Sequence, residues 1–256
     1  MLTPDRKPFH IPTERGRVGR FCILPGAPER VAQIAALLDE PIFIGQNREF
    51  TVWNGSLEGE TVTVCSTGIG GPSTAIAVEE LADCGAKTLI RVGTCGGIAL
   101  QVGSGDLVVA TGAVRQDGTS AEYAPPEYPA VPDLEVTAAL AEGARMTKRV
   151  VHCGVVQSKD SFYGQHSPKR MPTAGALTER WEAWRRLGVL ASEMEAAALF
   201  TVGAARGLHT GAVFHVIWNQ ERANAGLDTN AEESHDTSAA IRAAVEGIRV
   251  LLRKKF

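Results

Sequence analysis

The chain has 256 residues, and its 26 Lys and Arg against 29 Asp and Glu give a formal net charge of −3. This length allows one large domain with a sizeable core, and the weakly acidic charge provides no basic field for nucleic acid or a membrane surface. No run of about 18 apolar residues occurs, so the sequence predicts no membrane-spanning helix.

The first half of the chain alternates short apolar runs with amphipathic segments. Residues 21–24, 62–65 and 88–92 predict strands, and residues 30–38 and 74–84 have the apolar rhythm of helices. The turn that follows residue 65 contains GIGGPS at positions 68–73. Its glycines allow a backbone to come close to a ligand.

The second half continues the alternation. Strands are predicted at 106–114, 150–157 and 211–218, and helices at 134–146, 178–186, 193–206 and 234–253. Segment 115–133 is predicted to be an irregular loop or strand extension, and 158–178 a lid. Strands interleaved with helices predict an α/β fold, a single-domain three-layer sandwich over 1–256 in which helices flank a twisted mixed β-sheet, with 1–18 as an N-terminal arm.

The cysteines indicate a reducing compartment. They are odd in number, scattered and mostly set in apolar runs, which favours reduced, buried thiols over a disulfide framework. The first residues, MLTPDRKPFHIP, lack the apolar centre of a signal peptide. We therefore expect a cytoplasmic protein with free thiols at Cys22, Cys65, Cys84, Cys95 and Cys153.

A cation stands beside a glycine-threonine turn where a predicted buried strand ends. Arg91 and Thr94 lie in the run TLIRVGTCGG at 88–97. Ligands of open α/β sheets bind at the carboxyl ends of strands, and an arginine with a hydroxyl suits an anionic group such as phosphate. The alternative is a structural arginine that pairs with an acid near a tight turn.

Motif searches exclude several other chemistries. The loop GIGGPS departs from the dinucleotide fingerprint, because proline and Ser73 fill its last two positions. No GxxxxGK[ST] loop, HExxH or CxxC pattern, or GxSxG elbow occurs. Glycine turns with arginines near them at positions 30, 48 and 91 remain, and this combination binds an anion without supplying a nucleophile.

The segment SEMEAAA at 192–198 has two interpretations. Ser192 and Glu195 have the spacing of a capping box, under which Met194 is a core residue. In the second interpretation Glu195 lies in a cleft and accepts hydrogen bonds from the hydroxyls of a sugar. Met194 then packs against the apolar face of that sugar.

Six stretches occur together in one order: PGAPERV (25–31), REFTVW (48–53), VCSTGIGGPSTAIAVEEL (64–81), RVGTCGG (91–97), DSFYGQ (160–165) and SEMEAA (192–197). Through them the chain resembles the nucleoside phosphorylases of the uridine phosphorylase type over nearly its whole length. The resemblance implies a nucleoside phosphorylase-like fold. It also implies reversible phosphorolysis of uridine, or of deoxyuridine or another pyrimidine nucleoside, to uracil and ribose 1-phosphate in nucleoside catabolism and pyrimidine salvage.

The resemblance further implies a role for individual residues. The catalytic residues are Arg91, Thr94 and Glu195. Phosphate is expected to contact Gly26, Arg30, Arg48, Arg91, Gly93 and Thr94, the ribose His10, Glu193, Met194 and Glu195, and the base Cys95, Gly96, Phe162, Gln165 and Ile217. Arg48 and His10 are expected from a neighbouring subunit, in a homo-oligomer that is a hexamer built as a trimer of dimers.

Some of these residues have simpler interpretations. Arg30 can be a solvated residue in the first turn of a helix, and Arg48 can form an exposed ion pair with Glu49. Phe162 can belong to the core, and His10 to a disordered tail.

The mechanism implied by the resemblance requires no cofactor, because phosphate is a co-substrate. Uracil leaves as an anion, and donors in the base pocket stabilise it as an oxyanion hole would. Purine-cleaving relatives protonate the base through an aspartate after the late strand. Asn219 stands at about that position and cannot supply a proton, which favours a pyrimidine.

Two positions depart from the familiar pattern. Ala27 replaces an aspartate beside the phosphate site, and Ser167 replaces an arginine that pairs with the uracil carbonyl. His166, Lys169 and Arg170 are the candidates to take over from that arginine. The alternatives for the whole protein are a purine nucleoside phosphorylase, a hydrolytic nucleosidase and a non-catalytic nucleoside-binding or scaffold protein.

A monovalent cation such as K⁺ is the last expectation from the resemblance. Related enterobacterial enzymes bind one at the dimer interface through positions that correspond to Glu49, Ile69 and Ser73. Two such sets across a twofold axis form an oxygen-only cage, which suits a hard cation. The alternative is an ordinary hydrogen-bond cluster at an interface.

Overall fold

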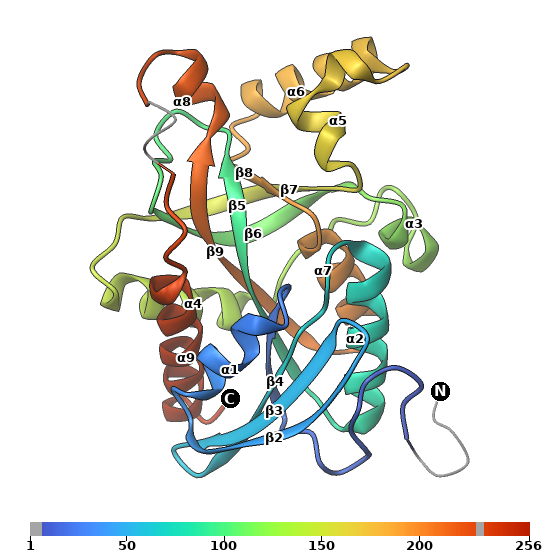
Figure 1. Ribbon diagram of the computed structural model, residues 1–256, viewed down its shortest axis with the longest axis vertical. Helices are drawn as coiled ribbons and strands as arrows, with labels where there is room; N and C mark the ends of the chain where they lie inside the picture. The colour runs from blue at the N-terminus through green and yellow to red at the C-terminus, as the bar shows by residue number, and fades with distance from the viewer. Residues whose placement is uncertain (1–6, 229–232) are drawn as a thin grey trace.

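One β-sheet organises the molecule (Figure 1). The computed structural model describes residues 7–228 and 233–256, so the first six residues of the expected arm lie outside the described residues. Within this described part the sheet has nine strands: β1 (Phe21–Pro25), β2 (Asp39–Asn47), β3 (Phe50–Leu57), β4 (Glu60–Cys65), β5 (Thr88–Gly97), β6 (Leu107–Gln116), β7 (Val151–Lys159), β8 (Ala191–Glu193) and β9 (His209–Asn219).

The sheet is mixed, as expected. Its strand order is β2-β3-β4-β1-β5-β8-β7-β6-β9, with an additional pairing of β9 to β5. Strand β1 runs parallel to β4 and β5, and β9 runs parallel to β5, whereas β2, β3 and β4 form antiparallel hairpins. The second pairing of β9 joins strands β5 to β9 into a closed ring, which the sequence did not predict.

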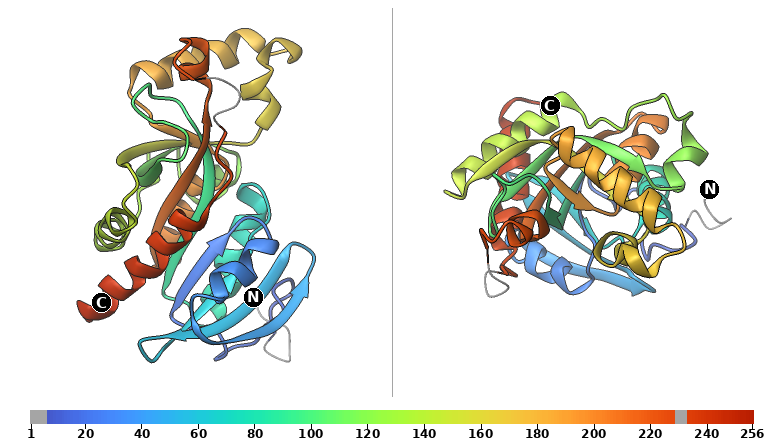
Figure 2. Two further views of the ribbon diagram at one scale, coloured as in Figure 1. Left: turned by 60° about the vertical axis from the view of Figure 1, so that its left-hand side comes forward. Right: turned by 90° about the horizontal axis from the view of Figure 1, so that it is seen from above.

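Helices cover both faces of the sheet, as Figures 1 and 2 show. They are α1 (Glu29–Ala35), α2 (Gly71–Cys84), α3 (Thr119–Tyr123), α4 (Leu134–Met146), α5 (Phe162–His166), the 3₁₀ helix η1 (Pro168–Arg170), α6 (Ala174–Arg186), α7 (Ala196–Ala205), α8 (Gln220–Asn224) and α9 (Ser238–Arg253). None of the described helices has the length and apolar character needed to cross a membrane.

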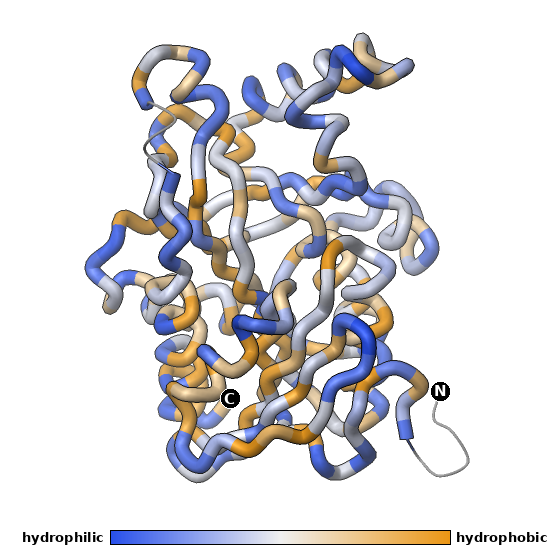
Figure 3. Tube along the Cα trace, viewed as in Figure 1, coloured by the Kyte–Doolittle hydropathy of each residue, from blue (hydrophilic) through white to orange (hydrophobic). Residues whose placement is uncertain are grey.

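Two buried apolar clusters lie on opposite faces of the sheet. One contains side chains of α2 and α7, and the other contains side chains of α1, α4 and α9. Along β5, Leu89 belongs to the first cluster and Ile90 and Val92 to the second, because successive strand residues point to opposite faces. Figure 3 shows the apolar stretches in the central strands and a mostly polar segment at α5 and α6. The predicted three-layer α/β fold is confirmed.

Several local predictions were wrong. Strands β2 and β3 were missed. Strand β2 is an edge strand without a buried residue, so it has no apolar alternation to detect, whereas β3 lies inside the sheet and is mostly buried. Segment 115–133, predicted as a loop or strand extension, contains the end of β6 and helix α3. Segment 158–178 contains α5, η1 and the start of α6, and its role as a lid stays a prediction. The cysteines are free and mostly buried, but Cys153 is exposed.

Candidate active site

A cavity of about 910 Å³ lies at the carboxyl ends of the parallel strands β1, β5 and β9. This is the edge at which open α/β sheets bind ligands. Among the residues predicted from the sequence, the cavity is lined by Gly26, Arg30, Glu49, Ile69, Arg91, Thr94, Cys95, Gly96, Phe162, Gln165, Glu193, Met194, Glu195 and Ile217.

Two guanidinium groups converge at one end of the cavity. A methyl group added to Gly26 would lie 3.9 Å from both Arg30 Nη2 and Arg91 Nη1. Arg30 Nη1 and Arg91 Nη1 are buried and have no hydrogen-bond partner. Burial and the nearby charge of Arg91 lower the pKa of Arg30. Buried donors without a partner are costly, so this end of the cavity is built to receive an anion that accepts from both arginines.

Arg91 is held between two buried carboxylates. Its Nε donates to Glu193 Oε2 at 3.1 Å, and its Nη2 donates to Glu195 Oε2. Burial opposes the charged form of Arg91, but Glu195 and Glu193 outweigh burial and raise its pKa. Phe214 lies beneath, with its ring centroid 5.6 Å from Arg91 Cζ. The structural interpretation of Arg91 as the partner of an acid is therefore correct, and the binding of an anion by its free Nη1 stays a prediction.

Glu195 joins the anion end of the cavity to the glycine loop after β4. The Gly70 N–H donates to Glu195 Oε1 at 2.6 Å. Gly70 and Gly68 have φ angles of 94° and 69°, which an L side chain rarely adopts, so this approach requires glycine. Burial raises the pKa of Glu195, against the effect of Arg91 and together with that of Glu193. Met194, the residue before Glu195, also lines the cavity.

The predicted capping box is wrong. Helix α7 begins at Ala196, Ser192 lies in β8, and Glu195 forms no side-chain bond to the helix. Glu193 does the capping instead, because it accepts from the backbone N–H of Glu195 and Ala196 at 2.9–3.0 Å. Its carboxylate also accepts from Ser158 Oγ. Glu193, predicted to contact ribose, therefore has its carboxylate occupied by structural bonds.

The cavity is also lined by an ammonium group that the sequence analysis missed. Lys159 ends β7 and is 5% exposed, and its Nζ donates to Ser192 Oγ at 2.7 Å. Burial lowers the pKa of Lys159 to about 8. Gln165 and His166 line the cavity beside it, and burial followed by the charge of Lys159 lowers the pKa of His166. The available signal was a polar triplet, residues 157–159, at the carboxyl end of a buried strand.

The comparisons with known proteins identify the family. A model described as the phosphorylase superfamily matches residues 20–253. The chain belongs to this superfamily.

Three relatives show how close this phosphorylase is to proteins with named substrates. A uridine phosphorylase of Treponema pallidum is 51% identical over 244 residues, 95% of this chain and 94% of the relative. A uridine phosphorylase of Klebsiella aerogenes is 46% identical over 239 residues, 91% and 92% of the two chains. A guanosine phosphorylase of Halorubrum lacusprofundi is 38% identical over 247 residues, 94% and 98%. These names include both a pyrimidine and a purine nucleoside, so membership of the superfamily alone does not identify the base.

Asn219 of the phosphorylase has a structural role. Its Nδ2 donates to the carbonyls of Ala99 and Val102, and its Oδ1 accepts from the N–H of Glu221 and Arg222 at the start of α8. The side chain is fully buried and does not line the cavity. Asn219 therefore neither donates a proton to a base nor contacts it from this position.

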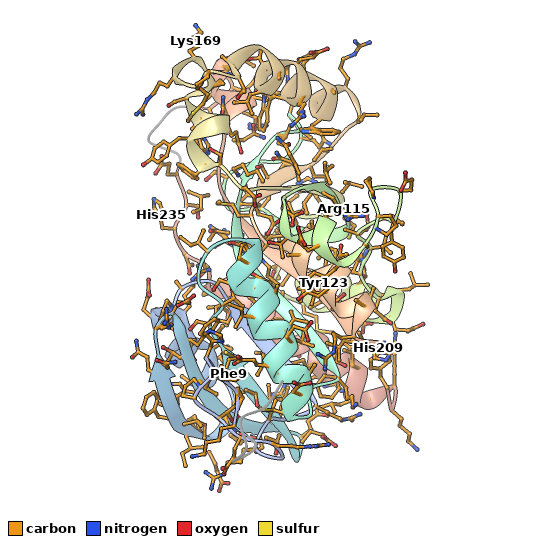
Figure 4. The ribbon with its side chains drawn as sticks, turned by 90° about the vertical axis from the view of Figure 1, so that its right-hand side faces the viewer. Phe9, Arg115, Tyr123, Lys169, His209 and His235 are labelled. Atoms are coloured by element: carbon orange, nitrogen blue, oxygen red, sulfur yellow. The ribbon has the colours of Figure 1, made fainter. Side chains whose placement is uncertain are left out.

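The candidates proposed to replace the base-pocket arginine separate clearly. His166 lines the cavity, whereas Lys169 and Arg170 are exposed in η1 and do not. Figure 4 shows Lys169 at the outer end of this segment. Phe162 is 51% exposed and lies on the cavity wall, so the interpretation as a core residue is wrong.

Three predicted phosphate or ribose residues lie outside the cavity of this phosphorylase chain. Arg48 is exposed in the turn between β2 and β3, with a φ of 52°. His10 pairs with Glu80 on α2, with Nδ1 2.7 Å from Oε1, so it is anchored and not in a free tail. Gly93 lies behind Arg91, and a methyl group on it would approach the Phe214 ring to 2.9 Å.

Two of the three predicted cation ligands, Glu49 and Ser73, meet beside the glycine loop. Ser73 Oγ donates to Glu49 Oε1 at 2.8 Å and also contacts the Thr67 carbonyl. Ile69 is 78% exposed at the rim of the cavity. Among the described residues, no group of three or more His, Cys, Asp or Glu side chains forms a site of the kind that suits a transition metal.

Proposed function

We propose that this phosphorylase catalyses the reversible phosphorolysis of uridine to uracil and ribose 1-phosphate. The observation that carries the proposal is the pair of buried, unpartnered guanidinium nitrogens at Gly26, in one cavity that is also lined by a buried ammonium group. Its near relatives named as uridine phosphorylases support the same activity. Deoxyuridine and other pyrimidine nucleosides present the same base edge and are included as substrates.

Phosphate binds between Arg30, Arg91 and Thr94 in this mechanism. Charge-assisted hydrogen bonds of this kind contribute about 1.5–3 kcal/mol each. A phosphate oxygen forms a bond to C1′ of the ribose while the C1′–N1 bond breaks, and the electron pair of that bond leaves with uracil. Glu195 accepts hydrogen bonds from the ribose hydroxyls, and Met194 packs beneath the sugar ring. The departing uracil anion takes its proton from solvent.

The base edge of uracil matches the side chains of Lys159, Phe162 and Gln165, and we call this part of the cavity the base end. Uracil presents an acceptor, a donor and an acceptor at O2, N3–H and O4. The amide of Gln165 supplies one donor and one acceptor, and the ammonium of Lys159 supplies the second donor. Phe162 lies where it can cover the ring. A charged donor at a carbonyl oxygen also stabilises the leaving anion, by the logic of an oxyanion hole.

Phosphate dependence tests the proposed function. We expect the enzyme to release uracil from uridine only when phosphate is present, with ribose 1-phosphate as the second product. Chromatography of the products, with and without phosphate, makes the measurement. Equal release of uracil in phosphate-free buffer, with free ribose, would show a hydrolytic nucleosidase. Turnover of guanosine or inosine without uridine would show a purine enzyme, and no turnover a binding protein.

We also propose that two subunits share each active site, in a hexamer built from dimers. Arg48 and His10 lie outside the cavity of their own chain, on a hairpin turn and on the arm beside α2. Family resemblance assigns both to the neighbouring subunit. A twofold axis makes such an exchange reciprocal. We further place the enzyme in the cytoplasm, in nucleoside catabolism and pyrimidine salvage, and cell fractionation checks the location.

Mixed subunits test the shared site. We expect Arg48→Ala and Glu195→Gln each to be nearly inactive and to regain about a quarter of wild-type activity when unfolded and refolded together. Half of randomly paired dimers are mixed, and one of their two sites is intact. Glu195→Gln is preferred to Arg91→Ala, which would leave two buried carboxylates unpaired. Recovery no higher than the single variants, with mixed oligomers demonstrated by mass spectrometry, would contradict the shared site.

A monovalent cation at Glu49, Ile69 and Ser73 is the remaining proposal. Glu49 and Ser73 are already in contact, and their oxygens suit K⁺. We expect a higher Tm in potassium chloride than in tetramethylammonium chloride at equal ionic strength. The difference should vanish in Ser73→Ala, which removes one of the oxygens. The same Tm in both salts for the wild type would count against the site.

A further inference from the structure

The Ser192 hydroxyl contacts both polar side chains of the base end, Lys159 and Gln165. Ser192 Oγ lies 2.7 Å from Lys159 Nζ, 2.7 Å from Gln165 Oε1 and 2.5 Å from Gln157 Oε1. The chain of contacts continues away from the cavity. Gln157 Nε2 donates to Gln116 Oε1 at 2.7 Å, and the indole Nε1 of Trp184 donates to the same oxygen at 3.0 Å.

The direction of every bond in this chain follows from its outer end. The indole of Trp184 can only donate, so Gln116 must present its oxygen to it. The same oxygen receives Gln157, which must then turn its amino group toward Gln116. The oxygen of Gln157 consequently faces Ser192. No choice of amide orientation remains, because Gln116 faces the indole N–H, which can only donate, and Gln157 faces the Gln116 oxygen, which can only accept.

The inner end sets the direction of the last two bonds. The ammonium of Lys159 can only donate, so Ser192 accepts from it and has a single proton to give. Gln157 and Gln165 compete for this proton. Gln157 is 3% exposed and depends on a protein donor, whereas Gln165 lies on α5 and lines the cavity. When a base enters, Gln165 can turn to it while Ser192 donates to Gln157.

We propose that Ser192, Gln157 and Gln116 are positioning residues that hold the Lys159 ammonium toward the base, leave the Gln165 amide available to it and tie both to helix α6 through Trp184. This inference rests on the proposed function of the same cavity. Gln157 and Gln116 do not line the substrate cavity, and Ser192, which does, acts through its bonds to Lys159 and Gln165.

The packing of α6 explains why such a connection matters. No residue of α6 is buried. The helix is held by polar bonds, since Trp181 Nε1 donates to Glu221 at 2.8 Å and Arg185 pairs with Glu221 at 2.9 Å, in addition to the bond from Trp184. A second cavity of about 390 Å³ lies against α6, and Gln116, Gln157, Lys159 and Gln165 line it. The chain of bonds thus runs along the wall between the two cavities.

The charges around Lys159 provide a measurable readout. The titratable groups around Lys159 are Glu193 of β8, Glu195 in the turn before α7, Cys95 of β5 and His166 of α5. Burial lowers the pKa of Lys159 to about 8 in this setting. A hydrogen bond from the ammonium to Ser192 favours the charged form, so the loss of that acceptor must lower the pKa of Lys159 further.

The experiment compares Ser192→Ala and Gln116→Met with the wild-type enzyme. For Ser192→Ala we expect the KM for uridine and the Ki for uracil to rise about tenfold, with the KM for phosphate unchanged. The alkaline limb of kcat/KM should move to lower pH. Gln116→Met, which does not touch the substrate cavity, should move the same quantities in the same direction by about threefold. Ser120→Ala is the matched control, because Ser120 is a buried serine that accepts from Arg115 and donates to Asp117.

A second measurement makes the test independent of turnover. Trace labelling with acetic anhydride over a range of pH, read by mass spectrometry, gives the apparent pKa of Lys159 in each variant. A lower pKa of Lys159 in Ser192→Ala and Gln116→Met supports the proposed chain of hydrogen bonds. An unchanged pKa in Ser192→Ala overturns it, and a silent Gln116→Met overturns the part beyond Ser192. A wild-type enzyme that does not cleave uridine refutes the proposed function. The labelling result still shows whether Ser192 and Gln116 act on Lys159.

Discussion

Replacement of Glu195 by glutamine should lower kcat/KM for uridine by about a hundredfold or more while the fold is kept. Glutamine has the same shape, but it lacks the charge that pairs with Arg91 and strengthens bonds to the ribose hydroxyls in the transition state. Its amino group would also face a donor, either the Gly70 N–H or the Arg91 guanidinium. Steady-state kinetics with uridine and saturating phosphate make the measurement.

Asp133→Asn is the matched control for this change. Asp133 caps helix α4 by accepting from the Val136 N–H, and asparagine caps a helix equally well. Its other oxygen lies 2.7 Å from Nδ1 of the exposed His209, and a surface contact of this kind contributes little to stability. The control should therefore keep both its Tm and its activity. If Glu195→Gln retains its Tm and its activity stays near that of the wild type, Glu195 has no catalytic role. Because Glu193 and not Glu195 caps α7, a loss of activity cannot be attributed to an uncapped helix.

The second large effect is expected at Lys159. Lys159→Met should lower kcat/KM for uridine by about a hundredfold, the size found when one donor to a developing negative charge is removed. In the wild type the pKa of Lys159 is lowered by burial from 10.5 to about 8. Below about pH 8 the ammonium is charged and stabilises the uracil anion, and above it the neutral amine does so poorly. Activity should therefore fall as pH rises through about 8.

The pH profile separates this role from a structural one. Lys159→Met should lose the limb near pH 8, because no ammonium remains to titrate. Lys87→Met, at an exposed lysine next to β5, should keep both the rate and the limb. A limb that persists unchanged in Lys159→Met would assign it to another group and contradict the role of Lys159 at the base.

The fold could be predicted where local pattern and tertiary environment agree. The runs at 21–24, 62–65 and 88–92 are buried on both faces in the structure, so their continuous apolar character was sufficient evidence of a strand. Strand β2 could not be found in the same way, because it lies at the sheet edge with no buried residue. The additional pairing of β9 with β5 is a contact between residues far apart in the chain, and no local pattern records it.

The sequence by itself determined that Arg30 and Arg91 meet at one cavity, because Arg30 follows β1 and Arg91 lies in β5, and these parallel strands end at the same edge of the sheet. Only the tertiary structure decided the roles of Glu193 and Glu195, which are two positions apart in the chain. Glu193 caps α7, and Glu195 contacts the Gly70 loop. The tertiary structure alone revealed Lys159, because β7 meets β8 through long-range pairing that places Ser192 within hydrogen-bond distance of its ammonium. The chemistry of a buried charge depends on such neighbours, and they are set by packing between segments far apart in the sequence.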